Sequence, residues 1–212
     1  MSKTSNWKNQ IRFHFISDSI SSQHIGNFEN WLTSLSIELN NRDITLMNYG
    51  VNGDTSRLVF NRLHYDVLSK SPAYVMVQFG LNDCNRWATE SDYERVMPNS
   101  FKSNIEELLI KIYQKEPKKI FILTNHPTLL EKSYDIRNKE YNEVIRKIFY
   151  KLKDKIESLN LIDIEREWIK IIDNSEFNLN NLLIANGFHL SKSGNEIYKK
   201  YLIEEVIKSL SL

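Results

Sequence analysis

The sequence lacks several features that would assign it to a specialised class of protein. Its 212 residues include one cysteine, Cys84, so an internal disulfide is excluded and nothing indicates an oxidising compartment. There are only six glycines and four prolines, and we find no repeat or low-complexity segment. No apolar run is long enough to span a bilayer, and the first residues lack the apolar core of a signal peptide. We therefore expect a cytoplasmic protein without a membrane span.

The sequence also lacks an excess of charge of either sign. Its 28 basic residues are balanced by 27 acidic ones, which leaves a formal net charge of +1. A balance of this kind gives no sign of a nucleic-acid partner, and we expect none. The length suits one well-buried unit, so we predict a single domain over residues 1–212. The oligomeric state is left open.

What the chain does contain is a regular alternation of strand and helix patterns. Five short runs are rich in Ile, Val, Phe and Leu without the alternation of a half-exposed strand: 11–16, 44–48, 73–79, 119–124 and 159–164. Such strands separated by helices predict a five-stranded parallel sheet in a three-layer α/β/α sandwich of the flavodoxin-like kind. The Asn-rich stretch 166–184 is irregular, and we predict a long loop there with at least one helical turn.

Three helices are marked by apolar residues at helical spacing. The residues are Phe28, Trp31, Leu32, Leu35 and Leu39; Val144, Ile145, Ile148, Phe149, Leu152 and Ile156; and Tyr198, Leu202, Val206 and Leu210.

Polar or glycine-rich turns follow the first four predicted strands. In a parallel α/β sheet, ligands bind outside the carboxyl ends of the strands, so these turns are where a site is expected. They are Ser17-Asp18-Ser19, the segment Asn48–Thr55, Gly80-Leu81-Asn82-Asp83 and Asn125-His126-Pro127.

Each candidate group in these turns has an ordinary structural explanation as well as a chemical one. Ser19 could be a nucleophile or a helix cap. Gly53 and Asn82 could donate to an oxyanion or simply form turns. His189, in the loop before the last helix, could be a general base or a surface residue. Ser191 or Ser193 can cap that helix and so hold the loop.

Taken together and in this order, the four groups resemble the SGNH hydrolases, also called GDSL esterases. Ser17-Asp18-Ser19 resembles the first family block, Asn48–Thr55 the second, Gly80–Asp83 the third and Asn186–His189 the last. The resemblance implies that Ser19 is the nucleophile and His189 its base. It implies an oxyanion hole made by Gly53 and Asn82, without metal or cofactor. It also implies a small-molecule ester substrate, such as an acetyl ester of a carbohydrate-like compound.

The sequence departs from the family pattern at two positions. Ser17 stands where the family has glycine, and a positive φ there would strain the turn. Asn186 stands where the family has the triad aspartate, and an amide can favour the wrong imidazole tautomer. Four interpretations stay open: an enzyme running on a Ser–His dyad, aided by Asp163 or Asp173; an impaired relative; an inactive ligand-binding protein; and an engineered Asp-to-Asn variant that traps ligand. A flavodoxin-like binding domain without covalent chemistry is a further alternative.

Other polar residues near these turns are candidates for substrate binding, each with a turn-forming or packing alternative. They are Asp18, Asn52, Asp83, Asn85, Trp87 and His126. The remaining histidines, His14, His24 and His64, have no metal-ligand spacing with a carboxylate or cysteine, so we predict no metal.

Overall fold

The fold is built on a parallel sheet of five strands in the order β2-β1-β3-β4-β5. The computed structural model describes residues 11–21, 30–87, 93–175 and 177–210. The strands are β1 (Ile11–Ser17), β2 (Ile44–Gly50), β3 (Tyr74–Gln78), β4 (Lys119–Leu123) and β5 (Leu159–Ile162). The predicted α/β architecture is therefore confirmed, and each predicted strand matches an observed one to within two residues at either end.

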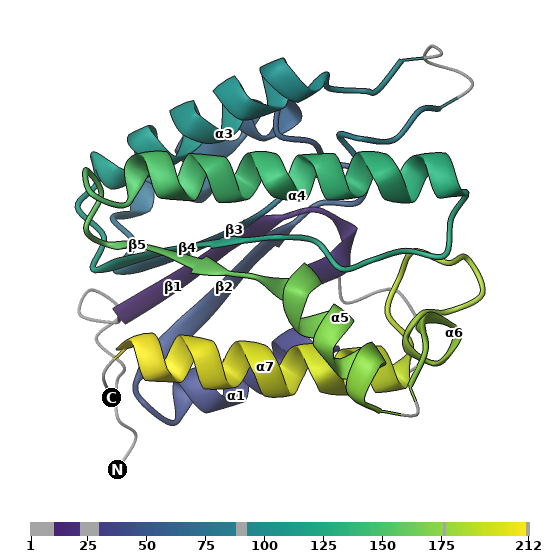
Figure 1. Cartoon of the computed structure of the whole chain (residues 1–212). Helices are drawn as coiled ribbons and strands as arrows, with labels where there is room; N and C mark the ends of the chain where they lie inside the picture. Colours follow the sequence, from purple (N-terminus) through teal and green to yellow (C-terminus); the bar gives the residue numbers. More distant parts are fainter. Residues whose placement is uncertain (1–10, 22–29, 88–92, 176, 211–212) are drawn as a thin grey trace.

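Helices cover both faces of the sheet, with α3 and α4 on one side and α1, α5 and α7 on the other (Figure 1). The longer helices are α1 (Trp31–Asn40), α3 (Pro98–Tyr113), α4 (Lys132–Leu152), α5 (Ile164–Asn174) and α7 (Lys192–Leu210). Short α-helical turns are α2 (Leu63–Asp66) and α6 (Leu179–Leu182), and 3-10 turns are η2 (Ser19–Ser21), η3 (Leu58–Asn61) and η4 (Leu68–Lys70).

The apolar runs form strands because both faces of the sheet are covered. Every residue of β3 is buried, which explains why its sequence does not alternate between apolar and polar. Across the sheet the rings of Phe13 and Phe121 stack with centroids 5.8 Å apart. At the start of α7 the Ser191 hydroxyl accepts a hydrogen bond from the Gly194 amide at 3.1 Å. Ser191 therefore caps the last helix, while Ser193 lies within it.

Two differences from the sequence-based prediction concern helix boundaries. The stretch predicted as a long loop is more regular than expected, because it holds most of α5 as well as α6. The Asp163 side chain caps α5 by accepting from the Arg166 amide. Ile156 lies beyond the end of α4. Phe28, assigned to the first helix, lies outside the described residues.

The strand order places a topological switch at β1. The chain runs from β1 to β2 on one side and then to β3 on the other side. In the register, Ser17 at the end of β1 lies opposite Gly50 of β2 and Gln78 of β3. The turns after these three strands therefore leave the sheet at the same level, where α/β folds bind their ligands.

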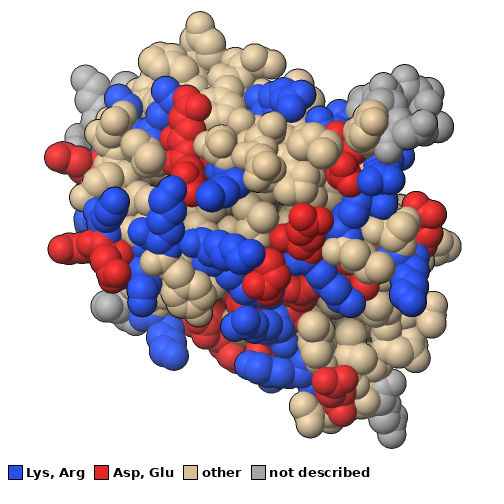
Figure 2. Space-filling view, turned by 45° about the horizontal axis from the view of Figure 1, so that its top comes forward, with Lys and Arg blue, Asp and Glu red and all other residues tan. Residues whose placement is uncertain are grey.

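The surface beside α3 and α4 carries charges of both signs. In the view with these helices turned forward, Lys and Arg are interspersed with Asp and Glu (Figure 2). Ion pairs such as Lys151 with Glu106 and Lys139 with Asp135, each at 2.8 Å, account for part of this pattern. This face therefore offers no broad field of one sign. Among the described helices, none is long and apolar enough to cross a membrane.

Candidate active site

Ser19 and His189 meet at the carboxyl edge of the sheet although they lie far apart in the sequence. Ser19 begins the 3-10 turn directly after β1, and His189 lies in the loop before α7. Ser19 Oγ is 3.0 Å from His189 Nε2. A hydroxyl within hydrogen-bond reach of an imidazole is the arrangement that serine acyl transfer needs. The Ser19 residue is 7% exposed, so little solvent competes for this contact.

The turn that carries Ser19 is held by a small polar network. Ser17 Oγ lies 2.5 Å from Ser21 Oγ, and Ser21 Oγ donates to Asn48 Oδ1 at 3.1 Å. The Asn48 amide returns a bond to the Ser21 carbonyl at 3.0 Å. Ser17 is not among the described non-glycine residues that have a positive φ. Serine at position 17 is therefore accommodated without a left-handed backbone, and its hydroxyl helps to fix the turn.

Asn186 contacts His189 through its nitrogen and not through its oxygen. The Asn186 Oδ1 atom accepts from the Phe188 and His189 amides, each at 3.0 Å. These two N–H groups fix the orientation of the side chain, because only the oxygen can accept them. The NH2 group is thereby directed to His189 Nδ1, at 2.8 Å.

This contact decides which nitrogen of His189 carries the proton. A neutral imidazole that accepts at Nδ1 has its hydrogen on Nε2, the nitrogen that faces Ser19 Oγ. In that tautomer His189 donates to Ser19 and cannot take its proton. Burial also lowers the pKa of His189 below its ordinary value, which keeps the ring neutral at physiological pH.

Neither carboxylate considered as a substitute for the missing acid contacts His189. Asp163 is held by Arg146, with Oδ1–Nη2 at 2.7 Å and Oδ2–Nε at 2.8 Å. Arg146 and the helix cap keep the pKa of Asp163 below its usual range. Asp173 lies near the end of α5. Within the described ranges, the side chains that form a hydrogen bond with the His189 ring are those of Ser19 and Asn186 alone.

Three hydrogen-bond donors in the turns after β1, β2 and β3 have no acceptor among the described residues. In the part of the chain that the structure describes, the Asn82 side-chain NH2 has no hydrogen-bond partner although it is buried. Nor do the backbone amides of Ser19 and Gly53 donate to a described residue. Gly53 has φ +73°, a conformation that costs glycine little and other residues more. Unpaired donors at a buried site are suited to bind an anionic oxygen.

Arg95 supports the Gly53 loop, and sequence analysis did not identify it. Its guanidinium donates to the Gly53 carbonyl at 2.8 Å and lies 3.9 Å from the centroid of the Trp87 ring. The Arg95 amide donates to the Asn85 carbonyl at 2.9 Å. Arg95 thus joins the turns after β2 and β3. Neither periodicity nor a motif marks it, because the contact with Gly53 crosses 42 residues of chain.

The remaining predicted binding residues fall into two groups. Trp87, 38% exposed, lies beside Gly53, Asn85 is half-buried and Asn52 is exposed. In contrast, Asp18 and Asp83 are fully buried. The first three residues are therefore accessible to a ligand at the rim of the site, whereas the two aspartates are buried below it.

The buried carboxyls of Asp18 and Asp83 hold the turns from below. Asp18 Oδ1 accepts from the Ile20 amide at 3.0 Å, and Asp83 Oδ1 accepts from the Ser56 amide at 2.9 Å. Burial raises the pKa of each to about 7. The nearby Asn82 side chain acts against this rise in the pKa of Asp18, because it favours the ionised carboxylate. The Asn82 NH2 group nevertheless does not meet the geometry of a hydrogen bond to Asp18. Both carboxyls therefore act on the backbone of the turns.

His126 lies beneath the loop that carries His189. It is fully buried, its Nε2 lies 2.9 Å from the Phe188 carbonyl, and its Nδ1 lies 2.9 Å from the Tyr198 hydroxyl. The carbonyl can only accept, so Nε2 carries the proton and Nδ1 accepts from Tyr198. His126 therefore supports the loop that carries His189 and leaves neither nitrogen for a ligand.

The burial of His126 predicts a pH-dependent contribution to stability. Burial lowers the pKa of His126 to about 4, against 6.5 in the unfolded chain. Between these values His126 is protonated more in the unfolded state, so its contribution to the free energy of unfolding falls as the pH falls, by up to about 1.4 kcal/mol per pH unit. The raised pKa values of Asp18 and Asp83 act in the opposite direction, so the test is the difference between two proteins. In thermal melts from pH 7 to pH 4, the stability of the parent relative to His126→Gln should fall as the pH falls, whereas His64→Gln, at an exposed residue, should follow the parent. A difference between the parent and His126→Gln that does not change with pH would contradict the assignment.

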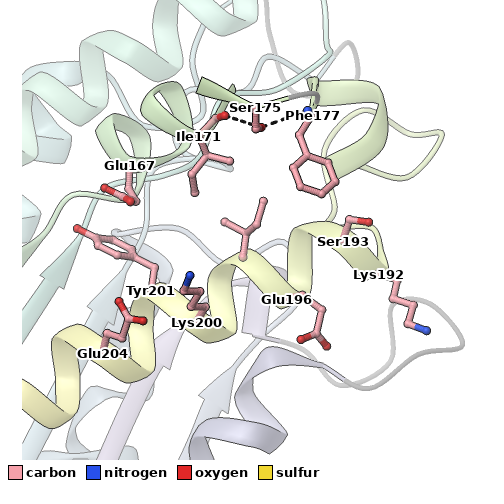
Figure 3. Close-up of a pocket in the computed structure, with 11 residues that line it drawn as sticks. Glu167, Ile171, Ser175, Phe177, Lys192, Ser193, Glu196, Lys200, Tyr201 and Glu204 are labelled. Atoms are coloured by element: carbon pink, nitrogen blue, oxygen red, sulfur yellow. Dashed lines mark hydrogen bonds between the residues drawn. The ribbon is translucent and has the colours of Figure 1, made fainter. Parts of the chain in front are cut away.

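A separate groove lies between α5 and α7 (Figure 3). Ile171 and Phe177 face into it, and Glu167, Lys200 and Tyr201 are among the residues around it. None of the candidate catalytic residues lines this groove.

Among the described residues, no group of three or more His, Cys, Asp or Glu side chains could hold a metal ion.

Comparisons with known proteins identify the family and agree with the fold. Residues 14–202 match the family model described as GDSL-like Lipase/Acylhydrolase. No curated protein sequence matches significantly. A lipase/acylhydrolase from Enterococcus faecalis superposes with a TM-score of 0.74 at 19% identity, covering 92% of this chain and 95% of that one.

Two acetylxylan esterases have similar folds. One, from Geobacillus stearothermophilus, gives a TM-score of 0.75 at 18% identity, with 92% of this chain and 94% of that one covered. The other, named AlAXEase, gives 0.75 at 21% identity, with 92% and 100% covered. At these identities the superpositions show the fold. The family match spans nearly the whole chain, from β1 to α7, and the chain therefore belongs to the GDSL-like lipase/acylhydrolase family of ester hydrolases.

Proposed function

We propose that the chain is a serine esterase in which Ser19 is the nucleophile and His189 the general base. The observation that carries this proposal is the 3.0 Å contact between Ser19 Oγ and His189 Nε2 at the carboxyl edge of the sheet. Ser19 Oγ attacks the ester carbonyl while Nε2 takes its proton. The imidazolium then protonates the leaving alcohol, and the neutral ring activates water to hydrolyse the acyl-enzyme.

The negative oxygen of the tetrahedral intermediate is bound by the unpaired donors. These are the Ser19 and Gly53 amides and the Asn82 side chain. Arg95 holds the Gly53 loop through the Gly53 carbonyl, which fixes the donor before the substrate arrives. Donors fixed in advance stabilise charge that develops in the transition state without reorganisation.

Asn186 limits this mechanism at the base. Proton transfer from Ser19 requires a free lone pair on Nε2, with the imidazole proton on Nδ1. That proton would face the Asn186 NH2 group across the 2.8 Å contact. Two donors would then face each other with no acceptor between them, which is unfavourable. The chain must break this contact to act as a base, so we infer a slow esterase.

The substrate we propose is an acetyl or similarly short ester of a small, carbohydrate-like alcohol. Two proteins of similar fold are described as acetylxylan esterases. In one of them, replacing a serine or an aspartate by alanine is described as making a catalytic mutant. The exposed Trp87 ring beside Gly53 offers an apolar face on which a sugar ring can pack.

The experiment compares initial rates on p-nitrophenyl acetate, p-nitrophenyl octanoate and acetylated xylo-oligosaccharides. Both the chain and its Asn186→Asp variant are assayed, so that a slow parent is not mistaken for an inactive fold. The acetyl esters should react fastest with both proteins. Hydrolysis of none of the three by either protein would contradict the proposal.

The contact between Asn186 and His189 favours a second candidate, a protein that binds an ester without turning it over. Calorimetry with an acetylated xylo-oligosaccharide distinguishes the two functions. Binding by both proteins with hydrolysis by neither would identify the binding protein. Hydrolysis that Asn186→Asp accelerates would identify the esterase.

Asn82 should contribute mainly to the chemical step. We expect Asn82→Ala to lower kcat by about 10²- to 10³-fold with little change in KM, because the amide contacts the oxygen only as negative charge develops. Steady-state kinetics in the Asn186→Asp background will measure this. Asn99→Ala, which removes an exposed amide on α3, is the matched control. A rise in KM at unchanged kcat would instead assign Asn82 to ground-state binding.

A further inference from the structure

We propose that Asn186 is a deamidation site and that loss of its amide completes the catalytic triad. Asn186 is followed by Gly187, and the sequence contains one other Asn-Gly pair, Asn52-Gly53. Asparagine before glycine is the pair most prone to deamidation, because glycine has no side chain to hinder attack by its nitrogen. The gain in activity that we infer rests on the proposed function, whereas the modification itself does not.

Solvent reaches the residue that would react. Asn186 is exposed, and it lines an open hollow of ≈ 770 Å³ together with Gly187, Leu129 and Glu131. The water that hydrolysis requires therefore has direct access to this side chain.

The hydrogen bonds of Asn186 activate its side-chain carbonyl. Oδ1 accepts from two backbone amides at 3.0 Å, which draws electron density from Cγ and makes it more electrophilic. The same two donors remain in place to bind the oxygen when Cγ becomes tetrahedral and its oxygen negative. A small oxyanion site is thus already built around the amide that must be hydrolysed.

The reaction exchanges ammonia for water without oxidation or reduction. Once the Gly187 amide leaves the Ile184 carbonyl, to which it donates at 2.8 Å, its nitrogen attacks Asn186 Cγ and loses its proton. The Cγ–Nδ2 bond breaks, and ammonia leaves. Water then opens the cyclic imide at the bond between Cγ and the Gly187 nitrogen, which gives aspartate at position 186. Opening at the main-chain carbonyl gives isoaspartate instead.

The aspartate would fit the contacts already present. One carboxylate oxygen replaces Oδ1 as acceptor for the Phe188 and His189 amides. The other replaces Nδ2 beside His189 Nδ1 and accepts a hydrogen bond from Nδ1–H, which leaves the lone pair of Nε2 free to act as a base toward Ser19. Isoaspartate would lengthen the backbone and displace this oxygen.

A small converted fraction would dominate the measured rate. If the aspartate form turns over about 10⁴-fold faster, conversion of about one molecule in a hundred raises the specific activity about 100-fold. Specific activity should therefore rise with time after purification, while most molecules are still unmodified at position 186.

The experiment incubates the purified full chain for several days in mildly alkaline buffer. Peptide mass spectrometry follows the gain of about one dalton at position 186, and p-nitrophenyl acetate hydrolysis is assayed in parallel. An Asn52→Gln variant removes the second Asn-Gly pair and should still gain mass at position 186, which separates the two possible sites of modification. Asn186→Gln should gain neither mass nor activity. Ser19→Ala should gain mass at 186 without activity.

The outcomes separate the modification from the proposed function. A mass gain at 186 with a proportional rise in rate supports the inference. No mass gain at 186, while Asn52 or a free peptide of residues 180–195 deamidates, overturns it and leaves the esterase proposal intact. A mass gain without activity overturns the activation step if Asn186→Asp is itself active. If Asn186→Asp is inactive, the proposed function fails and the modification stands.

Discussion

Replacing Asn186 with aspartate should raise the kcat for p-nitrophenyl acetate by up to about 10⁴-fold, the factor that separates Asp from Asn at the same position of a serine-protease triad. The physical reason is the tautomer of His189. The Asn186 NH2 group now lies 2.8 Å from Nδ1 and keeps the ring proton on Nε2. A carboxylate reverses this preference and also stabilises the imidazolium formed during attack. KM should change little, since the substitution acts behind the imidazole.

The pH dependence of this variant provides an independent readout. Burial alone lowers the pKa of His189 in the parent chain. A neighbouring carboxylate stabilises the protonated ring, so the acid limb of kcat/KM should move to higher pH in Asn186→Asp. Asn99→Asp is the matched control, because it makes the same chemical change at an exposed residue of α3. If Asn99→Asp accelerates hydrolysis as much as Asn186→Asp, a general charge effect replaces the triad explanation.

In the Asn186→Asp background, Ser19→Ala should lower kcat by about 10⁶-fold, the scale found when the nucleophile of a complete serine triad is removed. The hydroxyl forms the covalent bond, and the oxyanion donors cannot offset its loss, because without its attack no negative oxygen forms for them to stabilise. Burst kinetics with p-nitrophenyl acetate will detect the acyl-enzyme before substitution and its absence afterwards.

The loss of kcat expected for Ser19→Ala depends on which residue stands at position 186. In the parent chain we expect a low starting rate because of Asn186, so the same substitution should show a smaller ratio. Ser103→Ala, which removes an exposed hydroxyl on α3, should leave the rate unchanged. Retention of more than a small fraction of the activity in Ser19→Ala would show that another group is the nucleophile.

The sheet and the edge that the turns share were predictable because they depend on local sequence. Buried parallel strands appear as short apolar runs, and β3 and β4 are buried along almost their whole length. Since the strands are parallel, the turns that follow them must share one edge. The α5 helix was harder to identify, although Ile164, Trp168 and Ile172 are spaced four residues apart. Asparagines lower helix propensity in the downstream half of that stretch, and they obscured the pattern.

The supports of the site could not be predicted, since they are contacts between distant segments. Arg95 binds Gly53 across 42 residues, and His126 binds the Phe188 carbonyl across 62. The resemblance to SGNH hydrolases predicts that Asn186 occupies the position of the triad acid. Which side-chain atom faces His189 follows only from the Phe188 and His189 amides that fix Oδ1.

Covalent labelling tests the central claim most directly. We expect a fluorophosphonate to modify Ser19, identified by peptide mass spectrometry, and to do so much faster in Asn186→Asp than in the parent chain. Unlike turnover, labelling depends on the nucleophile and its base and not on the identity of the natural ester. Equal labelling rates in the two proteins, or an adduct on a residue other than Ser19, would contradict a Ser19–His189 esterase limited by Asn186.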